Sequence, residues 1–171
     1  MAAAAGEGHH LTATRVIAAP LERVWQSWSD EQLIQDWWGP HGFTGAVHRM
    51  DFREGGTTLV SMSAPDFGQI YTIWTYTRIV PQQQIDFESR FADSEGRAID
   101  PIAPGVPDVV PHVVTLKDLG DGQTELSITE SGYSSLEAMQ MSKAGQEQVL
   151  DKLTLTAVKG GVASRGRRDS A

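Results

Sequence analysis

The sequence predicts a single α+β domain, in which two short helices and a run of β-strands are followed by one long helix. Three observations predict this class. Apolar residues recur at helical spacing over residues 20–38, they alternate with polar residues over most of residues 46–129, and no proline occurs from residue 134 onward. The length of 171 residues suits one domain. We expect that domain to span residues 11–158, between a flexible tail at 1–10 and a flexible basic tail at 159–171.

The first elements are a strand and two short helices. Residues 11–19 alternate as a strand does and end at Pro20, which suits the first turn of a helix because proline has no N–H to lose there. The first helix then has one apolar face: Leu21, Val24, Trp25 and Trp28. A second helix is expected between a cap at Ser29 or Asp30 and the break at Gly39-Pro40, with an apolar stripe formed by Leu33, Ile34, Trp37 and Trp38.

Six further strands are expected between residues 46 and 129. Tight turns at 54–56 and at Asp121-Gly122 predict hairpins, and in the second hairpin Val114 and Leu116 should face Leu126 and Ile128. Residues 92–111, between two of these strands, contain four prolines and no periodicity. A loop of that length is often a lid or a binding loop, and a surface insertion without a role is the alternative.

The last element is a long helix, capped at Ser134 or Ser135 and running to about Val158. Its inward stripe is expected to be Met139, Ser142, Gln146, Val149, Leu153 and Ala157. The second half of this stripe is apolar and the first half is polar. The polar half therefore indicates a helix face turned to a cavity, or else an exposed end.

Four of the five tryptophans lie within residues 25–38, which raises the question of a ligand pocket. We expect Trp25 and Trp28 to be core residues, because short helices need large apolar anchors. Neighbours on a helix point about 100° apart, so only one of Trp37 and Trp38 should face inward and form part of a cavity end wall.

Composition excludes several functions. The formal net charge of −8 disfavours binding to nucleic acid and to anionic membranes, and the absence of cysteine excludes disulfides and zinc–thiolate sites. The five histidines show no metal-binding spacing, and no motif for a cofactor or nucleotide occurs, so we expect neither metal nor cofactor. No basic leader or apolar run long enough to span a membrane is present, and we expect a cytoplasmic protein.

Two titratable residues share the phase of apolar strand residues. His112 is in phase with Val114, and Glu130 is in phase with Ile128. His112 is interpreted as a partly buried, hydrogen-bonded histidine, with general base as the alternative. Glu130 either faces a cavity, where loss of hydration would raise its pKa, or lies in water at the edge of the sheet.

The sequence resembles the START-like superfamily, which has the pollen-allergen and polyketide-cyclase fold. Within it, the chain is most similar to the bacterial branch related to activators of the heat-shock protein 90 ATPase. The matching segments span residues 15–158: "APLERVWQSWSDEQLIQDWWGPHGF" (18–43), "MDFREGG" (50–56), "YTRIVPQQQIDF" (76–87), "GDGQTELSITESGY" (120–133) and "VLDKL" (149–153).

The resemblance implies a helix-grip fold, with a curved seven-stranded antiparallel sheet around the long C-terminal helix. A ligand cavity would lie between them, closed at one end by the two short helices. Relatives commonly have a histidine near Ser142 and a tryptophan at Gln146, next to Gly145. Loss of that indole predicts a larger and more polar cavity. Trp74 stands where relatives often have a small residue, which would restore bulk from the sheet.

Together these features predict binding of a small, largely apolar ligand, lipid-like or aromatic, by a monomer or homodimer. The expected lining residues are Trp38, Met62, Trp74, Tyr76, Phe87, His112, Glu130, Ser142 and Gln146. One alternative is a cyclase, dehydratase or hydrolase that uses His112 or Glu130 as acid or base. A second alternative is a co-chaperone-like regulator of a heat-shock ATPase, with a chaperone as partner. The superfamily includes all three functions, and binding is favoured over catalysis.

Overall fold

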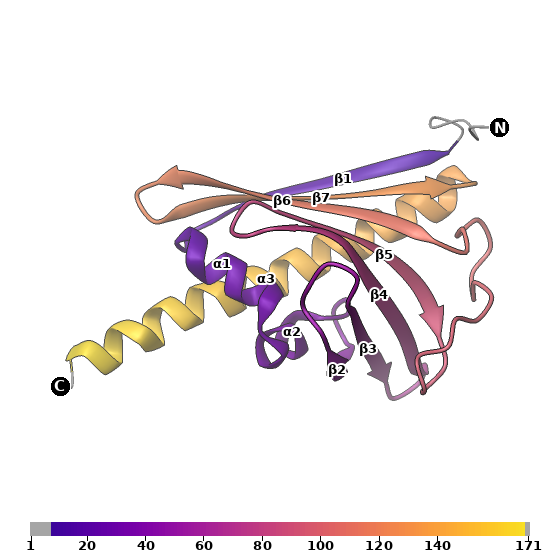
Figure 1. Cartoon of the computed structure of the whole chain (residues 1–171), viewed down its shortest axis with the longest axis horizontal. Helices are drawn as coiled ribbons and strands as arrows, with labels where there is room; N and C mark the ends of the chain where they lie inside the picture. The colour runs from indigo at the N-terminus through magenta and orange to yellow at the C-terminus, as the bar shows by residue number, and fades with distance from the viewer. Residues whose placement is uncertain (1–7, 170–171) are drawn as a thin grey trace.

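The computed structural model describes residues 8–169, with side chains described for residues 8–159. The chain forms one seven-stranded antiparallel sheet and three helices (Figure 1). In chain order the elements are β1 (His9–Ile17), α1 (Leu21–Ser29), α2 (Glu31–Trp37), β2 (Thr44–Met50), β3 (Thr57–Ala64), β4 (Gly68–Val80), β5 (Gln84–Ala92), β6 (Val110–Gly120), β7 (Gln123–Tyr133) and α3 (Leu136–Asp169). This order confirms the expected fold class.

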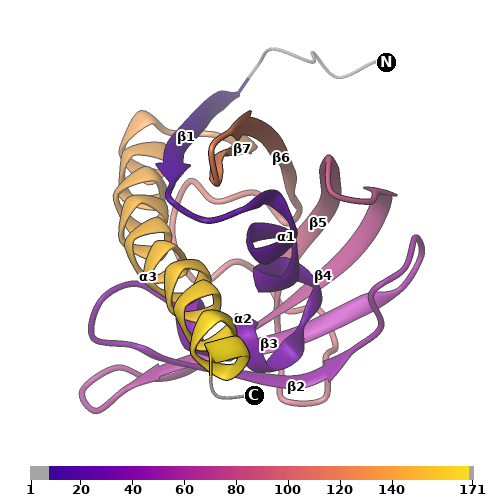
Figure 2. The same ribbon diagram turned by 90° about the vertical axis from the view of Figure 1, so that its left-hand side faces the viewer.

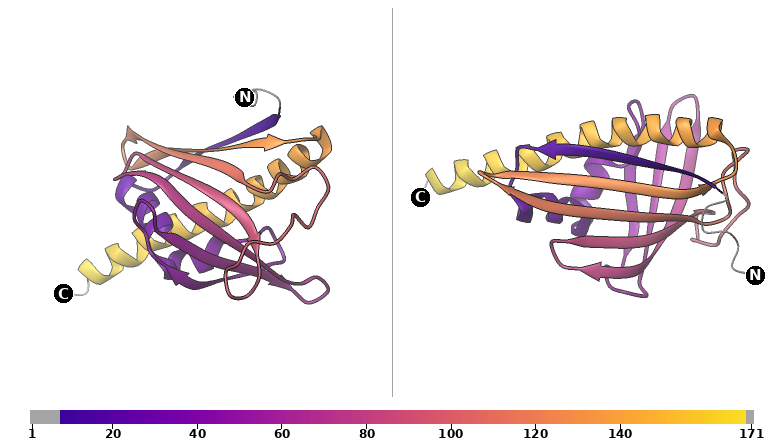
Figure 3. Two further views of the ribbon diagram at one scale, coloured as in Figure 1. Left: turned by 45° about the vertical axis from the view of Figure 1, so that its right-hand side comes forward. Right: turned by 90° about the horizontal axis from the view of Figure 1, so that it is seen from above.

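The sheet has the strand order β1-β7-β6-β5-β4-β3-β2, so β1 and β2 are its edges. Figure 2 shows the strands curling around α3, with α1 and α2 filling one end of the concave side. Seen from above, α3 runs alongside β1 and across the strands of the other half of the sheet (Figure 3). The sheet therefore curves around one side of α3.

Some element boundaries differ from the expected ones. Strand β1 begins at His9, two residues before the expected start of the domain at 11, and α3 continues in its backbone to Asp169, past the expected end near 158. The expected N-terminal tail otherwise falls on residues 1–7, which, like 170–171, lie outside the described residues. The division of the chain into one domain and two tails therefore stays a prediction.

Local signals in the sequence explain the ends of these elements. Asp30 caps α2 by accepting a hydrogen bond from the backbone N–H of Gln32, at 2.9 Å. Ser135 caps α3, since its hydroxyl oxygen accepts a hydrogen bond from the N–H of Ala138. In the β6–β7 hairpin Val114 pairs with Ile128 and Leu116 with Leu126, as the alternation predicts. No helix in the described part of the chain is long and apolar enough to cross a membrane.

The tryptophans divide between the core and a cavity in the concave side of the sheet. Trp28 and Trp37 are buried with ring centroids 4.6 Å apart, and the Trp37 indole N–H donates to the Ser27 carbonyl. Trp25 is only half-buried, against the edge of Phe52. Of the neighbouring pair, the fully buried Trp37 is a core residue. Trp38, one of the expected lining residues, is half-buried beside it and lies in the cavity wall.

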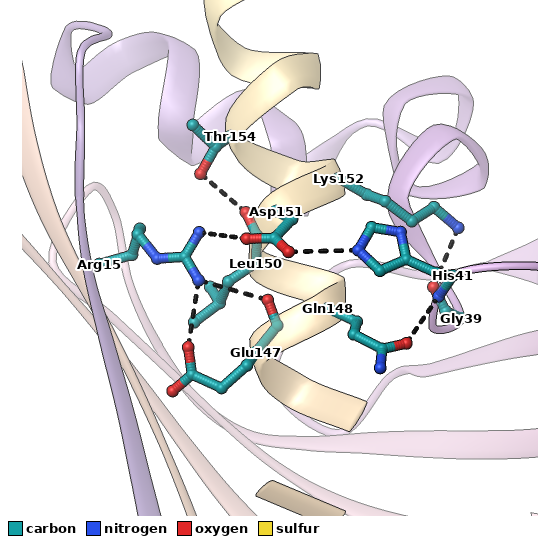
Figure 4. A network of polar contacts seen from close by, with 9 residues as sticks. All are labelled: Arg15, Gly39, His41, Glu147, Gln148, Leu150, Asp151, Lys152 and Thr154. Carbon is teal, nitrogen blue, oxygen red and sulfur yellow. Dashed lines mark hydrogen bonds and ion pairs between the residues drawn. The ribbon is translucent and has the colours of Figure 1, made fainter. Parts of the chain in front are cut away.

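A polar network fixes the outer face of α3 to the rest of the domain (Figure 4). Arg15 of β1 forms ion pairs with Glu147 and Asp151, and Asp151 also lies 3.2 Å from the Nε2 atom of His41. His41 belongs to the 38–43 loop between α2 and β2. Asp151 therefore connects an edge strand and this loop through one helix position.

Lys152 binds the backbone of the same 38–43 loop. Its ammonium donates to the carbonyl oxygens of Trp38 (3.4 Å), Gly39 (2.9 Å) and Phe43 (3.2 Å), and the Gln148 side chain accepts from the N–H of His41. Burial lowers the pKa of the Lys152 ammonium, because the charged form loses hydration. The three carbonyls supply hydrogen bonds in place of that water.

The variant Lys152→Met should lower the free energy of unfolding by about 2 kcal/mol, because it removes hydrogen bonds donated by a charged group. It should also raise the hydrogen-exchange rates of amides in residues 38–43, as measured by mass spectrometry. The matched control is Lys143→Met, at an exposed position of the same helix. Equal stability and equal exchange in the two variants would show that Lys152 does not hold the loop.

Candidate functional site

A cavity of about 490 Å³ lies between α3 and the concave face of the sheet. The 38–43 loop, strands β3 to β7, the loop between β5 and β6, and α3 all contribute to its wall. Most of the lining side chains are apolar, among them Trp38, Met62, Phe91 and Val149. Met141, which is 69% exposed, lies at the mouth.

The structure places six of the nine expected lining residues in this wall: Trp38, Met62, His112, Glu130, Ser142 and Gln146. They come from five different parts of the fold: the α2–β2 loop, β3, β6, β7 and α3. The cavity is therefore assembled from residues distant in sequence, at the places that strand and helix phase indicated.

The other three expected residues, Trp74, Tyr76 and Phe87, lie in the core and not in the cavity wall. Trp74 and Phe87 stack with centroids 5.0 Å apart, and the Tyr76 hydroxyl lies 2.7 Å from the Thr58 hydroxyl. Burial raises the pKa of Tyr76 to about 12, so its hydroxyl stays neutral. Strand phase gave the correct face of the sheet for these residues. It did not give their position along the strand, where α1 and α2 cover the face.

A buried polar cluster forms one wall of the cavity, and we call it the Glu130 cluster. Its members are Glu130, His112, Tyr133, Ser142 and Gln146. Glu130 is only 3% exposed, and its carboxylate is surrounded by donors. His112 Nε2 and Gln146 Nε2 each lie 2.7 Å from Oε1, while the hydroxyls of Ser142 and Tyr133 lie 2.6 Å and 2.9 Å from Oε2. A carboxylate offers about four acceptor positions, and here four donors are within reach.

The hydrogen bonds of His112 determine where its protons lie. Its Nδ1 atom is 2.9 Å from the carbonyl oxygen of Val110, and its Nε2 atom faces the Glu130 carboxylate. Both neighbours are acceptors, so both ring nitrogens carry hydrogen when Glu130 is ionised. The pair is then a buried imidazolium and carboxylate, directly opposite each other on β6 and β7.

Two opposing effects set the charge of Glu130. Burial by itself raises the pKa of this carboxyl, as the sequence led us to expect. The hydrogen bond and positive charge of His112, with the hydrogen bonds of Ser142 and Gln146, outweigh burial and lower the pKa to about 2. Burial and the nearby Glu130 charge raise the pKa of Tyr133, which therefore remains a neutral donor.

Tyr133 was not expected in the site. Strict alternation along β7 would put residues 130 and 133 on opposite faces. Gly132 adopts a φ of 94°, and the pairing with β1 shifts register between His9 and Leu11 at the same place. This bulge returns Tyr133 to the face of Glu130. The Gly-Tyr pair at the end of the strand is the signal that could have indicated it.

The loop between β5 and β6 covers one side of the cavity, in the region expected at 92–111. Ala103, Pro104, Val106 and Pro107 contribute to the wall. The carbonyl oxygen of Gly105 accepts a hydrogen bond from the N–H of Ser134, at 2.9 Å. A Cβ atom at Gly105 would lie within 2.4 Å of the Ser135 hydroxyl oxygen, so glycine permits this close approach. The loop is thus attached to the start of α3.

In this arrangement neither His112 nor Glu130 is free to transfer protons. His112 has both nitrogens bonded to protein acceptors, and Glu130 has no free lone pair directed at the cavity. A general base needs an accessible lone pair. Among the described residues, no group of three or more His, Asp or Glu side chains is placed to hold a metal ion.

The variant Glu130→Gln should lower the free energy of unfolding by about 3 kcal/mol at about pH 7, because it removes the buried carboxylate to which the donors of the Glu130 cluster are directed. The Glu130 pKa is lower in the folded state than in the unfolded chain. Its contribution is therefore complete above the unfolded value of 4.5 and is lost as the pH falls toward 2. Urea unfolding of the wild type and of Glu130→Gln across this pH range should show that their difference in free energy of unfolding becomes smaller toward low pH.

The matched control for this prediction is Glu88→Gln, which changes an exposed carboxylate on β5. It should alter the free energy of unfolding by less than about 0.5 kcal/mol at every pH tested. If Glu130→Gln resembles this control, or if its deficit stays constant down to the lowest pH, the buried ion pair does not stabilise the fold as described.

Comparison with known proteins supports the fold and shows the family. Residues 18–157 match the family model described as Activator of Hsp90 ATPase homolog 1-like protein. No curated protein matches the sequence.

Solved structures share the fold. A Chromobacterium violaceum protein is 27% identical, with a TM-score of 0.73 over 86% of this chain and 96% of its own. A Mycobacterium smegmatis protein is also 27% identical, with a TM-score of 0.69 over 86% of this chain and 87% of its own. An Arthrobacter aurescens protein is 23% identical, with a TM-score of 0.75 over 88% and 86%. The family model covers most of the chain and the topology is that of the helix-grip fold. The protein therefore belongs to the Activator of Hsp90 ATPase homolog 1-like family of the START-like superfamily.

Proposed function

We propose that this protein binds a small, largely apolar molecule in the cavity between α3 and the sheet, and that the Glu130 cluster orients its polar end. The observation that carries the proposal is the cavity itself. Its volume of about 490 Å³ falls within the range of roughly 300–1,000 Å³ found for small-molecule sites. Its lining also has the usual character of such sites, mostly apolar with a few polar groups gathered on one wall.

The helix side of the cavity supports this proposal. A Cβ atom at Gly145 would meet no atom within 4 Å, so the helix leaves open space where a side chain could stand. One residue later, Gln146 occupies the position at which relatives commonly have a tryptophan. The cavity is larger and more polar on this side than it would be with tryptophan, which favours an occupant that is not wholly apolar.

The other two functions have weaker support. Enzymatic acid–base chemistry by His112 or Glu130 would need one of their protein hydrogen bonds to break first. The co-chaperone-like function rests on the family description alone. Stimulation of a heat-shock ATPase by the purified protein would favour that function over ligand binding.

A first test is native mass spectrometry of the purified protein, followed by extraction of any retained small molecule. Affinity for a neutral apolar dye such as Nile red then reports on the cavity. The variant Gly145→Phe should weaken dye binding at least about ten-fold, because the ring takes up space in the cavity. Unchanged binding in this variant would place the dye elsewhere on the protein and remove the support for the proposal.

Gly145→Ala is the matched control, and it carries a prediction of its own. A methyl group leaves most of the cavity open, so dye affinity should stay within about two-fold. Glycine inside a helix is unfavourable relative to alanine, and the methyl group meets no atom here. The free energy of unfolding should therefore rise by about 0.5–1 kcal/mol. Urea denaturation measures this rise, and a loss of stability would contradict the open space at this position.

A further inference from the structure

We infer that the polar end of the ligand is a neutral hydrogen-bond donor, the hydroxyl of a phenol or an alcohol, and that the carbonyl oxygen of Gln146 accepts its hydrogen bond. The same site disfavours carboxylates. This inference rests on the proposed function and specifies the class of molecule that the cavity takes. It follows from which hydrogen-bonding positions of the Glu130 cluster are already used and which remain free.

The donors of the cluster are almost entirely used. His112 donates from both ring nitrogens, and the hydroxyl hydrogens of Ser142 and Tyr133 are directed within the cluster. A single N–H of Gln146 remains. A ligand that only accepts hydrogen bonds therefore finds one free N–H in this cluster, and the other hydroxyls of the wall, on Thr72, Ser89 and Ser135, lie outside it.

Acceptor positions remain free on the cavity side. The Glu130 carboxylate only accepts, so the Gln146 amide must direct its nitrogen toward it, as observed at 2.7 Å. The Gln146 carbonyl oxygen is thereby turned away from Glu130, and it has no hydrogen-bond partner among the described residues. Gln146 is half-buried in the cavity wall, so this oxygen is placed to accept a hydrogen bond from an occupant. The oxygen atoms of Ser142 and Tyr133 add weaker acceptor positions.

The charges of the cavity disfavour an ionised ligand. No lysine or arginine occurs in the cavity wall formed by the described residues, and Glu130 already neutralises the charge of His112. A ligand carboxylate would lose its hydration without a counter-charge, close to the Glu130 carboxylate. A ligand ammonium is also disfavoured, because Glu130 has no free acceptor position and Glu137, the other carboxylate of the wall, is exposed. A neutral donor avoids both costs.

Three probes with one ring system test the inference: 2-naphthol, 2-methoxynaphthalene and 2-naphthoate. Displacement of Nile red at about pH 7 gives their relative affinities. We expect 2-naphthol to bind about ten-fold more tightly than 2-methoxynaphthalene, because this ratio corresponds to about 1.4 kcal/mol, within the range of a net hydrogen bond. The anionic 2-naphthoate should bind most weakly of the three.

Variants locate the acceptor. Gln146→Lys keeps a donor for the Glu130 carboxylate but has no acceptor, so it should reduce the preference for 2-naphthol over 2-methoxynaphthalene to within about two-fold. Gln140→Lys is the matched control, because Gln140 is exposed on the same helix and does not line the cavity. It should leave the preference unchanged. Thermal unfolding of both variants checks that they are folded.

The outcomes separate this inference from the proposed function. Equal affinity for the three probes, or tightest binding of 2-naphthoate, would overturn the inference while leaving ligand binding in the cavity intact. A preference that survives Gln146→Lys would also overturn it, because the acceptor would lie elsewhere. If no probe displaces the dye and the purified protein retains no small molecule, the proposed function fails and this inference fails with it.

Discussion

The ion pair between Glu130 and His112 is the interaction on which the rest of the site depends. It joins β6 and β7 at directly opposed positions, and through Ser142 and Gln146 it also joins the sheet to α3. A buried carboxylate is stable only when it is paired and fully hydrogen-bonded. The donors on the first half of α3 meet that requirement, so this half can face the sheet although its residues are polar.

The two halves of α3 contact the sheet in physically different ways. The cavity lies where the first half of the helix meets the second. From Val149 onward, buried Leu150 and Leu153 pack against the aromatic core. Before Val149 the helix meets the sheet through the Glu130 cluster and, at its start, through Ala138 and Met139, which pack with Leu11 and Val110. On its outer face, Arg15 and Lys152 anchor the helix to an edge strand and to the 38–43 loop. The helix is therefore held on both faces, next to the space beside Glu130.

The sequence predicted much of this arrangement, and its errors have physical causes. Alternation along β6 and β7 placed His112 and Glu130 on the concave face. Their direct pairing needs the turn at Asp121-Gly122 together with a register shift between Asp118 and Gly120, which the sequence pattern did not indicate. Alternation could not predict Tyr133, because the left-handed backbone of Gly132 reverses the phase. The alternation also led us to place Trp74 in the cavity wall, which is wrong. Alternation predicts which face of the sheet a side chain occupies, but it does not predict which elements cover that face.

The chemistry of the cavity is determined largely by one turn of α3. Ser142 and Gln146 supply the donors that keep Glu130 ionised, and Gly145 leaves the space between helix and sheet open. All three can change without altering the strand pairing or the aromatic core, because none of them contributes to either. The topology shared with proteins at 23–27% identity therefore does not fix the size or polarity of this cavity. The fold supplies a buried carboxylate on the sheet, and the facing turn of the helix sets the size and polarity of the space beside it.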